Sequence, residues 1–177
     1  MKFIKGMKNY DLLYKTEKDA RLIRHTDSDW GGCIDERKGT SGYVLQLGSK
    51  AIAWSSKKQA TTELSSAEAE YIAVTSAACE AVCLRRILDD LQQDNKEPTT
   101  LFCDNMSTIA MTRNPIFHNR TKQIEIRHHF IRELVDKKEI TLQFYRTDEQ
   151  LADIFTKAIS SEKFIYFSQE LGVQGYF

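Results

Sequence analysis

The sequence predicts an α/β domain in which helices pack on the faces of a mixed β-sheet. The chain has 177 residues, of which 41% are hydrophobic, and this is enough for one ordinary core. Short β-rich runs come first, and later runs alternate with segments of helical periodicity. A strand meander followed by alternating strands and helices is typical of a mixed sheet covered by helices.

The first half of the chain contains the predicted meander. Met1–Asn9 is basic, with apolar residues at helical spacing, and is expected to be a helix fragment. A strand is expected at Arg21–Thr26. The β-rich runs Gly42–Leu47 and Ala51–Trp54 are joined by Gly48–Ser49–Lys50, which predicts a hairpin with Trp54 in the core.

A long helix is predicted to begin at Ser65, because Ser65 and Glu68 match the capping box. Its apolar stripe at 3.6-residue spacing consists of Leu64, Ala67, Tyr71, Val74, Ala78, Val82 and Leu88. The remaining predicted elements are a strand at Thr99–Cys103, helices at Asn105–Thr112 and Ile124–Lys137, a strand at Ile140–Tyr145 and a final core helix at Glu149–Ile159.

The chain is neutral, with Lys+Arg 25 and Asp+Glu 25, which argues against simple coating of nucleic acid by bulk positive charge. The charges are segregated, however. Met1–Arg24 carries seven bases and three acids (+4), Glu63–Asp104 three bases and nine acids (−6), and Arg113–Lys138 seven bases and three acids (+4). An acidic centre between basic segments permits a nucleic-acid partner, although solvated helix faces give similar runs.

Membrane and disulfide chemistry are not expected. The longest apolar stretch, Tyr71–Leu84, is too short to span a bilayer, so no membrane partner is predicted. The four cysteines are too sparse for a secreted disulfide scaffold, which favours a reducing compartment. Cys79 and Cys83 are four residues apart on the long helix, but they lack zinc-site spacing and are interpreted as small core residues.

Four acids fall where the predicted elements can bring them together. Asp27 and Asp104 end strands, whereas Glu70 and Asp153 lie early in helices. Clustered carboxylates repel one another unless divalent cations bridge them, and hard oxygen ligands favour Mg²⁺ or Mn²⁺. Two such ions roughly 4 Å apart can promote phosphodiester cleavage. Taken singly, each acid is also explained as a turn, N-cap or first-turn residue.

Two neighbouring acids compete for these positions. Asp29 would point the same way as Asp27 along an extended strand, but Trp30 and the glycines that follow indicate that the chain is already turning there. Glu68 and Glu70 lie about 200° apart around a helix, so one of them faces the site. Glu68 is expected to take part in the capping box, so Glu70 is favoured as the glutamate that faces the site.

Eight sequence blocks, in order from about Leu22 to Ala158, resemble the ribonuclease H domain of Ty1/copia retrotransposon Pol polyproteins. They are His25-Thr-Asp-Ser-Asp-Trp-Gly-Gly, Gly39-Thr-Ser-Gly-Tyr, Trp54-Ser-Ser-Lys-Lys-Gln, Leu64-Ser-Ser-Ala-Glu-Ala-Glu-Tyr-Ile-Ala, Cys103-Asp-Asn-Met-Ser, Asn114-Pro-Ile-Phe-His-Asn-Arg-Thr-Lys, Ile126-Arg-His-His-Phe-Ile-Arg-Glu and Gln150-Leu-Ala-Asp-Ile-Phe-Thr-Lys. In addition, Lys2-Phe-Ile-Lys-Gly-Met-Lys-Asn-Tyr resembles the tail of the connection region that precedes this domain.

The resemblance implies a ribonuclease H-like fold with a five-stranded mixed sheet flanked by helices. It also implies a connection tail at residues 1–20, the domain at 21–160 and a C-terminal extension at 161–177. The implied activity is hydrolysis of the RNA strand of an RNA–DNA hybrid with two Mg²⁺ ions, or Mn²⁺ in their place, during reverse transcription. The implied partner is the reverse transcriptase portion of the same polyprotein, in a cytoplasmic retrotransposon particle or in the nucleus.

The resemblance also implies the site residues. Catalytic and metal-binding roles carry over to Asp27, Glu70, Asp104 and Asp153. Asp27 would bridge the two ions, and Asp153 would help to hold the second one. The substrate contacts that we expect are Lys57, Lys58, Gln59, Asn105, Ser107, Arg120, Lys122, His128 and Gln150.

One feature departs from cellular ribonucleases H. They carry a His in the loop before the last helix, whereas Arg146-Thr-Asp-Glu stands there in this chain. His128 and His129 lie on the preceding helix instead, so the proton donor is not identified. Two other functions stay open: a folded but inactive nucleic-acid-binding remnant, and an integrase or transposase core, which the long helix with its embedded Glu70 fits less well.

Overall fold

The computed structural model describes residues 9–14, 21–30, 38–60, 65–93, 97–113 and 122–175, without the side chains of residues 122–125. The predicted helix fragment Met1–Asn9 lies almost wholly outside these residues. The elements in chain order are β1 (Tyr10–Leu12), β2 (Leu22–Asp29), β3 (Thr40–Leu47), β4 (Lys50–Lys58), α2 (Ser66–Asp90), β5 (Thr99–Cys103), α3 (Met106–Arg113), α4 (Lys122–Asp136), β6 (Ile140–Phe144), the 3₁₀ helices η1 (Thr147–Glu149) and η2 (Leu151–Phe155), α5 (Ser161–Glu170) and β7 (Val173–Gly175).

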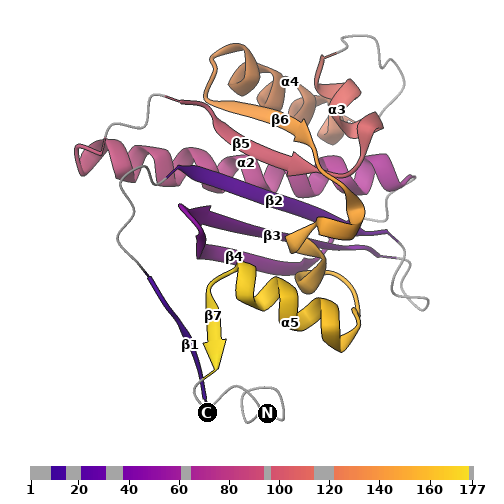
Figure 1. Cartoon of the computed structure of the whole chain (residues 1–177). Helices are drawn as coiled ribbons and strands as arrows, with labels where there is room; N and C mark the ends of the chain where they lie inside the picture. The colour runs from indigo at the N-terminus through magenta and orange to yellow at the C-terminus, as the bar shows by residue number, and fades with distance from the viewer. Residues whose placement is uncertain are drawn as a thin grey trace.

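Five strands form one mixed sheet in the order β4-β3-β2-β5-β6 (Figure 1). The strands β2, β3 and β4 are an antiparallel meander, whereas β5 is parallel to β2 and β6 is parallel to β5. This arrangement confirms the predicted fold class. Because β2 and β5 are parallel neighbours, their C-terminal ends meet at the same edge of the sheet.

Helices cover both faces of the sheet (Figure 1). Helices α2, α3 and α4 pack against one another on one face, and they enclose the main core with β5 and β6. On the other face, η2 packs on β2 and β3, and α5 contacts η2. This second core contains Val44, Ala51, Leu151, Phe167 and Leu171.

Helix α2 begins as predicted. The Ser65 side chain accepts a hydrogen bond from the Glu68 N–H at 3.2 Å, which caps the first turn. Of the predicted stripe, Tyr71, Val74, Ala78 and Val82 are buried against the sheet, and Leu64 lies outside the described residues. None of the described helices, α2 included, has the length and apolar character needed to cross a membrane.

A second small sheet and a further helix were not predicted. Strand β1 pairs antiparallel with β7, with Asp11 opposite Gln174. Helix α5 begins at the cap Ser160, whose side chain accepts the Lys163 N–H at 3.2 Å. The two predicted extensions, residues 1–20 and 161–177, thus contact each other through β1 and β7, while their boundaries stay predictions.

Four expectations about local structure were wrong. The segment Glu149–Ile159 contains the 3₁₀ helix η2 instead of an α-helix, and its Thr156 and Lys157 fold back onto β2. Strand β2 extends through Asp29 and so ends three residues later than the expected strand Arg21–Thr26, with Asp29 in the strand and not in a turn. Trp54 is 58% exposed because β4 is an edge strand. Cys79 and Cys83 lie at the surface of α2 and not in the core.

Candidate active site

The four predicted acids gather around the shared C-terminal edge of β2 and β5. Asp27 lies within β2, two residues before its end, and Asp104 follows the last residue of β5 directly. The two strands pair in parallel, with His25 opposite Phe102. Glu70 approaches from the second turn of α2, and Asp153 approaches from η2 on the opposite face. We refer to Asp27, Glu70, Asp104 and Asp153 as the four-acid cluster.

Asp27 is 1% exposed and points to the η2 side of the sheet. One of its carboxylate oxygens accepts a hydrogen bond from the Thr156 hydroxyl, and the other lies 3.4 Å from the Lys157 ammonium. Both partners come from the segment at the end of η2. The fold therefore holds Asp27 through a hydroxyl and a cation that lie 129 and 130 residues further along the chain.

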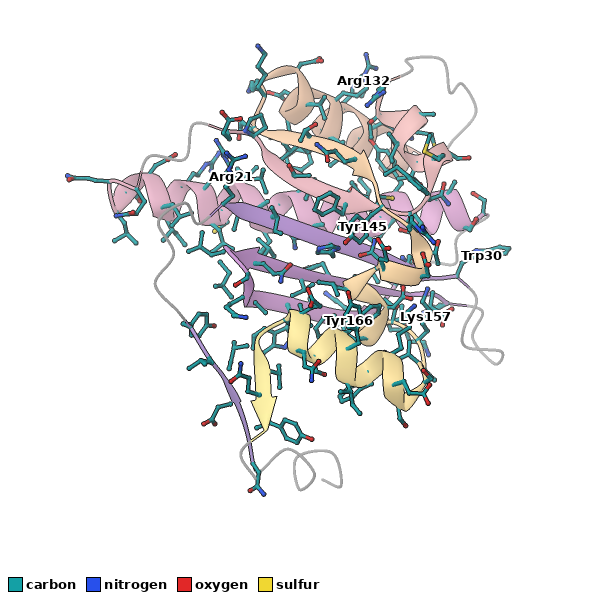
Figure 2. The ribbon with its side chains drawn as sticks, viewed as in Figure 1. Arg21, Trp30, Arg132, Tyr145, Lys157 and Tyr166 are labelled. Carbon is teal, nitrogen blue, oxygen red and sulfur yellow. The ribbon has the colours of Figure 1, made fainter. Side chains whose placement is uncertain are left out.

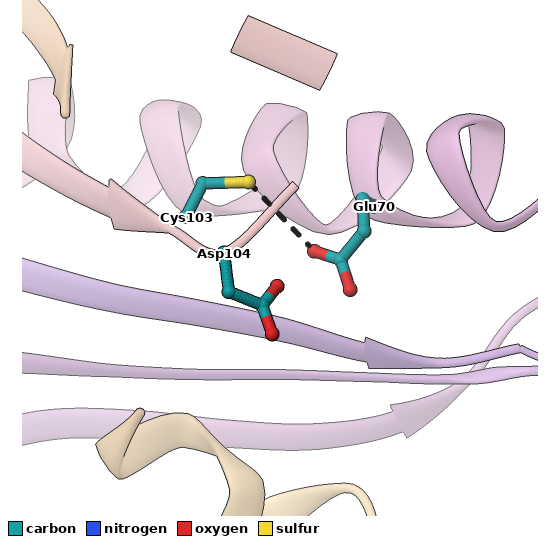
Figure 3. A group of neighbouring side chains, drawn as sticks. All are labelled: Glu70, Cys103 and Asp104. Carbon is teal, nitrogen blue, oxygen red and sulfur yellow. Dashed lines mark hydrogen bonds between the residues drawn. The ribbon is translucent and has the colours of Figure 1, made fainter. Parts of the chain in front are cut away.

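Glu70 is 5% exposed and lies on the α2 side of the same edge. One of its carboxylate oxygens accepts the backbone N–H of Ser28 at 2.8 Å, which ties α2 to β2. The other faces the Cys103 thiol, with 4.0 Å between oxygen and sulfur (Figure 3). Ligand atoms of Glu70, Cys103 and Asp104 lie within 4.8 Å of one another. Glu70 therefore reaches the sheet edge.

Asp153 is 2% exposed and is held by two lysines. Its two carboxylate oxygens lie 2.9 Å from the Lys157 ammonium and 3.0 Å from the Lys163 ammonium. The 3₁₀ geometry of η2 positions it, because the Gln150 side chain caps the Ala152 N–H at 3.4 Å and the Gln150 carbonyl accepts the Asp153 N–H at 3.1 Å. Figure 2 shows Lys157 beside this turn.

A glycine allows η2 to approach the sheet this closely. Gly42 lies opposite Asp27 on β3. A Cβ atom at this position would come within 2.6 Å of Thr156 Cγ2, a distance that real Cβ atoms essentially never show, and 3.0 Å from Phe155 Cβ. The next strand adds a further tie, because the Ser56 hydroxyl donates to the Phe155 carbonyl at 2.6 Å. The absence of a side chain at Gly42 therefore leaves room for Thr156 and Phe155 beside Asp27.

Burial of the four-acid cluster destabilises the ionised form of its carboxyl groups when no positive charge compensates them. Desolvation raises the pKa of Asp27 to about 6, and the charges of Asp153 and Asp104 add to this, while the Thr156 hydroxyl and Lys157 oppose it. Desolvation, followed by the charges of Asp27 and Asp104, raises the pKa of Glu70 well above its usual value. Asp27 thus interacts electrostatically with each of the other three acids.

The donor set fits a hard divalent cation. Carboxylate oxygens are the ligands that Mg²⁺ and Mn²⁺ prefer, and added positive charge would relieve the repulsion just described. The Cys103 sulfur nearby is a soft ligand, but burial, followed by the charge of Glu70, raises the pKa of its thiol far above neutrality. Carboxylates of the four-acid cluster are therefore the candidate ligands for such ions.

Two of the predicted substrate contacts are buried within the protein instead. Gln59 is 5% exposed, and its amide nitrogen donates to the Ala69 carbonyl at 3.0 Å and the Ser41 hydroxyl at 2.5 Å. Gln150 is fully buried, with its amide oxygen 3.1 Å from His25 Nδ1. Both amides are engaged in hydrogen bonds within the protein, and their predicted contact with substrate stays a prediction.

The other predicted contacts fall into three groups. Lys57, Lys58 and Ser107 are exposed, and Asn105 is half-buried with its side chain capping the Thr108 N–H of α3 at 3.1 Å. Arg120 and the side chain of Lys122 lie outside the described residues. His128 stacks on Tyr71, with 4.2 Å between ring centroids, which is a packing contact between α4 and α2.

Sequence reasoning missed the residues that surround the acids. Thr156, Lys157 and Lys163 contact Asp27 or Asp153, and the Ser28 N–H holds Glu70. The pairing of Lys157 with Asp153 could have been predicted, because the two residues are four apart in the sequence. The other contacts join residues far apart in the chain, and no local pattern marks them.

Comparison with known proteins identifies the family by sequence. A scan against protein-family models finds no match. The chain is 34% identical over 173 residues to the Pol polyprotein of transposon RE2 from Arabidopsis thaliana, covering 98% of this chain and 12% of the relative. It is 36% identical over 173 residues to that of transposon TNT 1-94 from Nicotiana tabacum, covering 98% and 13%. This chain is a Ty1/copia-type retrotransposon Pol segment.

A more distant relative agrees with this assignment. The Ty1-LR3 Gag-Pol polyprotein of Saccharomyces cerevisiae is 30% identical to this Pol segment over 158 residues, covering 84% of the segment and 8% of the relative. The segment therefore spans a small fraction of the curated relatives that it matches.

The solved structures identify the fold. The N-terminal RNase H domain of a Mycobacterium tuberculosis protein matches with a TM-score of 0.57 at 12% identity, covering 85% of this segment and 97% of that chain. LC11-RNase H1, solved in complex with an RNA/DNA hybrid, matches with a TM-score of 0.55 at 12% identity, covering 77% and 94%. The foamy viral protease-reverse transcriptase, also solved with a hybrid, gives 0.55 at 14% identity, covering 90% and 20%. The Pol segment therefore has a ribonuclease H-like fold.

Proposed function

We propose that this Pol segment hydrolyses the RNA strand of an RNA–DNA hybrid, with Mg²⁺ or Mn²⁺ ions held by the four-acid cluster. The observation that carries the proposal is the meeting of these acids, three of them almost fully buried, at one edge of a ribonuclease H-like sheet. Two structurally similar proteins were solved with an RNA/DNA hybrid, which supports this choice of substrate.

The side chains of this Pol segment fall into two groups around Asp27. Glu70 comes from α2 and Asp104 from the end of β5, with ligand atoms within 4.8 Å of each other, and Asp153 comes from η2. Asp27 is coupled to both groups, which supports the bridging position expected from the family resemblance. Bound divalent ions would supply positive charge and Lewis acidity for attack of water on the phosphodiester.

The protein also fixes the orientation of these carboxylates before any substrate arrives. The Ser28 N–H orients Glu70, and the Thr156 hydroxyl orients Asp27. Hydrogen bonds that orient metal-binding carboxylates in advance reduce the rearrangement needed for catalysis. The exposed Lys57 and Lys58 end β4, whose pairing through β3 places them at the same edge of the sheet as Asp29. We propose that they bind hybrid phosphates.

The decisive experiment uses a hybrid in which the RNA strand is labelled. The full chain should cleave this strand in the presence of Mg²⁺ or Mn²⁺, and Asp104→Asn should abolish cleavage. Asp29→Asn is the matched control, because it removes one carboxylate on the same strand outside the four-acid cluster, and it should retain cleavage. Circular dichroism would verify that each variant is folded.

Two outcomes would contradict the proposal. Hybrid binding without cleavage by the folded protein, with either metal, would favour an inactive remnant of a Pol polyprotein. Cleavage of duplex DNA in place of the RNA strand would favour another nuclease with the same fold. We further propose that the segment acts together with the reverse transcriptase portion of its polyprotein, which can be tested by repeating the assay with that portion attached.

A further inference from the structure

The Lys157 ammonium lies between two acids of the four-acid cluster. It is 2.9 Å from an Asp153 oxygen and 3.4 Å from an Asp27 oxygen. Both carboxylate side chains are 2% exposed, whereas the Lys157 side chain is 32% exposed. Within the described part of the chain, Lys157 is the one cation that pairs with two of the four acids.

Lys163 provides a comparison. Its ammonium lies 3.0 Å from the other oxygen of Asp153, and no ion pair joins it to Asp27 among the described residues. Lys157 therefore contacts one carboxylate oxygen of Asp27 and one of Asp153, while Lys163, on α5, contacts the other oxygen of Asp153. A divalent ion that used both Asp27 and Asp153 would need oxygens that Lys157 now contacts.

The fold gives the Lys157 side chain a place to move to. A cleft of about 460 Å³ opens beside it between η2 and α5. Its walls include Ile154, Ala158, Ser161 and Phe164. The aliphatic part of the lysine can pack along these walls while the ammonium stays in water, as long basic side chains commonly do. Release from the acids therefore does not require the backbone to unfold.

We propose that Lys157 and a divalent ion compete for the Asp27–Asp153 pair, so that Lys157 sets the affinity of the second metal position. This inference rests on the proposed function, because it assumes that the four-acid cluster holds metal. Its consequence is that this segment binds one divalent ion more tightly than the other. The position shared by Glu70 and Asp104, which Lys157 does not contact in the described structure, would fill first.

Calorimetric titration of Mn²⁺ into the full chain tests the competition without any activity measurement. Lys157→Met removes the charge and keeps the length of the side chain, and it should tighten the weaker Mn²⁺ site about tenfold or more. Lys157→Arg keeps the charge and should stay close to wild type. Lys137→Met is the matched control, since it removes a lysine paired with Glu133 on α4, and it should change nothing.

Chemical labelling gives a second readout of the same competition. Adding Mg²⁺ should increase the acetylation of Lys157, measured by peptide mass spectrometry, because the ion frees its amine. Lys137 should react equally with and without Mg²⁺.

Four results would overturn the inference. Mn²⁺ binding that is unchanged or weaker in Lys157→Met would show that the lysine does not compete with the ion. Equally tighter Mn²⁺ binding in Lys137→Met would show that the effect comes from the net charge of the protein and not from the position of Lys157. Absence of Mn²⁺ binding in every variant would overturn both this inference and the metal requirement of the proposed function. Hybrid cleavage by wild type, together with unchanged binding in Lys157→Met, would overturn the inference alone.

Discussion

Replacing Asp27 by asparagine should stabilise the metal-free protein at alkaline pH. The buried Asp27 carboxyl has its pKa raised from 3.8 to about 6, chiefly by desolvation. The folded state therefore holds this proton more tightly than the unfolded chain, and the free energy of unfolding falls as the pH rises through about 6. A shift of about two pKa units corresponds to about 3 kcal/mol.

The expected size of the effect follows from that shift. In EDTA at pH 8, Asp27→Asn should be more stable than wild type by about 3 kcal/mol, or about 6–12 °C in Tm for a domain of this size. Below pH 4, where Asp27 is protonated in both states, the difference should approach zero. Asp29→Asn is the control, because Asp29 lies two residues further along β2 and is half-buried.

The assay is urea denaturation in EDTA at several pH values, followed by circular dichroism for all three proteins. A variant that is less stable than wild type at pH 8 would refute the reasoning. So would a gain of equal size at pH 4 and pH 8, because the gain would then not come from the charge of Asp27. Addition of Mg²⁺ should stabilise wild type more than Asp27→Asn, because the variant lacks one of the four carboxylates.

Three further predictions concern residues around the site. Gly42→Ala should lower the free energy of unfolding by about 1–3 kcal/mol, because the new Cβ meets Thr156 and Phe155; unchanged stability in denaturant would contradict the close packing of η2. His25 is buried and neutral, with its pKa lowered to about 4, so its contribution of about 3 kcal/mol is present above pH 6.5 and is lost as the pH falls towards 4. His25→Asn should therefore lose less stability than wild type between pH 7 and pH 4, and an equal loss would exclude His25 as the cause. Arg24 is fully buried, and within the described residues its guanidinium stacks on Tyr43 without hydrogen bonds. Arg24→Met should therefore leave the free energy of unfolding unchanged or raise it. A loss above about 3 kcal/mol would show that the charge is needed.

The sequence was sufficient to predict the elements whose signals are local. The capping box at Ser65 placed the start of α2 within one residue, and the run Thr99–Cys103 coincides with β5. The meander was predicted because Gly48 and Ser49 mark the turn between two β-rich runs. The periodicity of a helix or strand shows which of its faces is buried, and this pattern can be read from residues that are close together in the sequence.

The missed features depend on contacts between distant residues. The segment around Asp153 was predicted as an α-helix, but its bonds to Asp27 from Thr156 and Lys157 hold it in a tighter turn. Strands β1 and β7 are three residues each, too short to show alternation, and they pair across nearly the whole chain. Gln59 and Gln150 were predicted to contact substrate, and their burial was missed because sequence does not reveal which polar side chains the fold buries.

The positions of the four acids were predicted better than their surroundings. Asp104 directly follows β5, and Glu70 rather than Glu68 faces β2 through Ser28. The expectation that Asp29 lies in a turn was wrong, and Asp27 is distinguished from it by its contacts with Thr156 and Lys157. Their catalytic and metal-binding roles stay predictions.

Analysis of the RNA ends produced from a labelled RNA–DNA hybrid tests the central claim most directly. Hydrolysis by water at the four-acid cluster predicts Mg²⁺-dependent products with 5′-phosphate and 3′-hydroxyl ends, and none from Asp104→Asn. Absence of cleavage by the folded protein, or products with 2′,3′-cyclic phosphate ends formed without Mg²⁺, would contradict the claim.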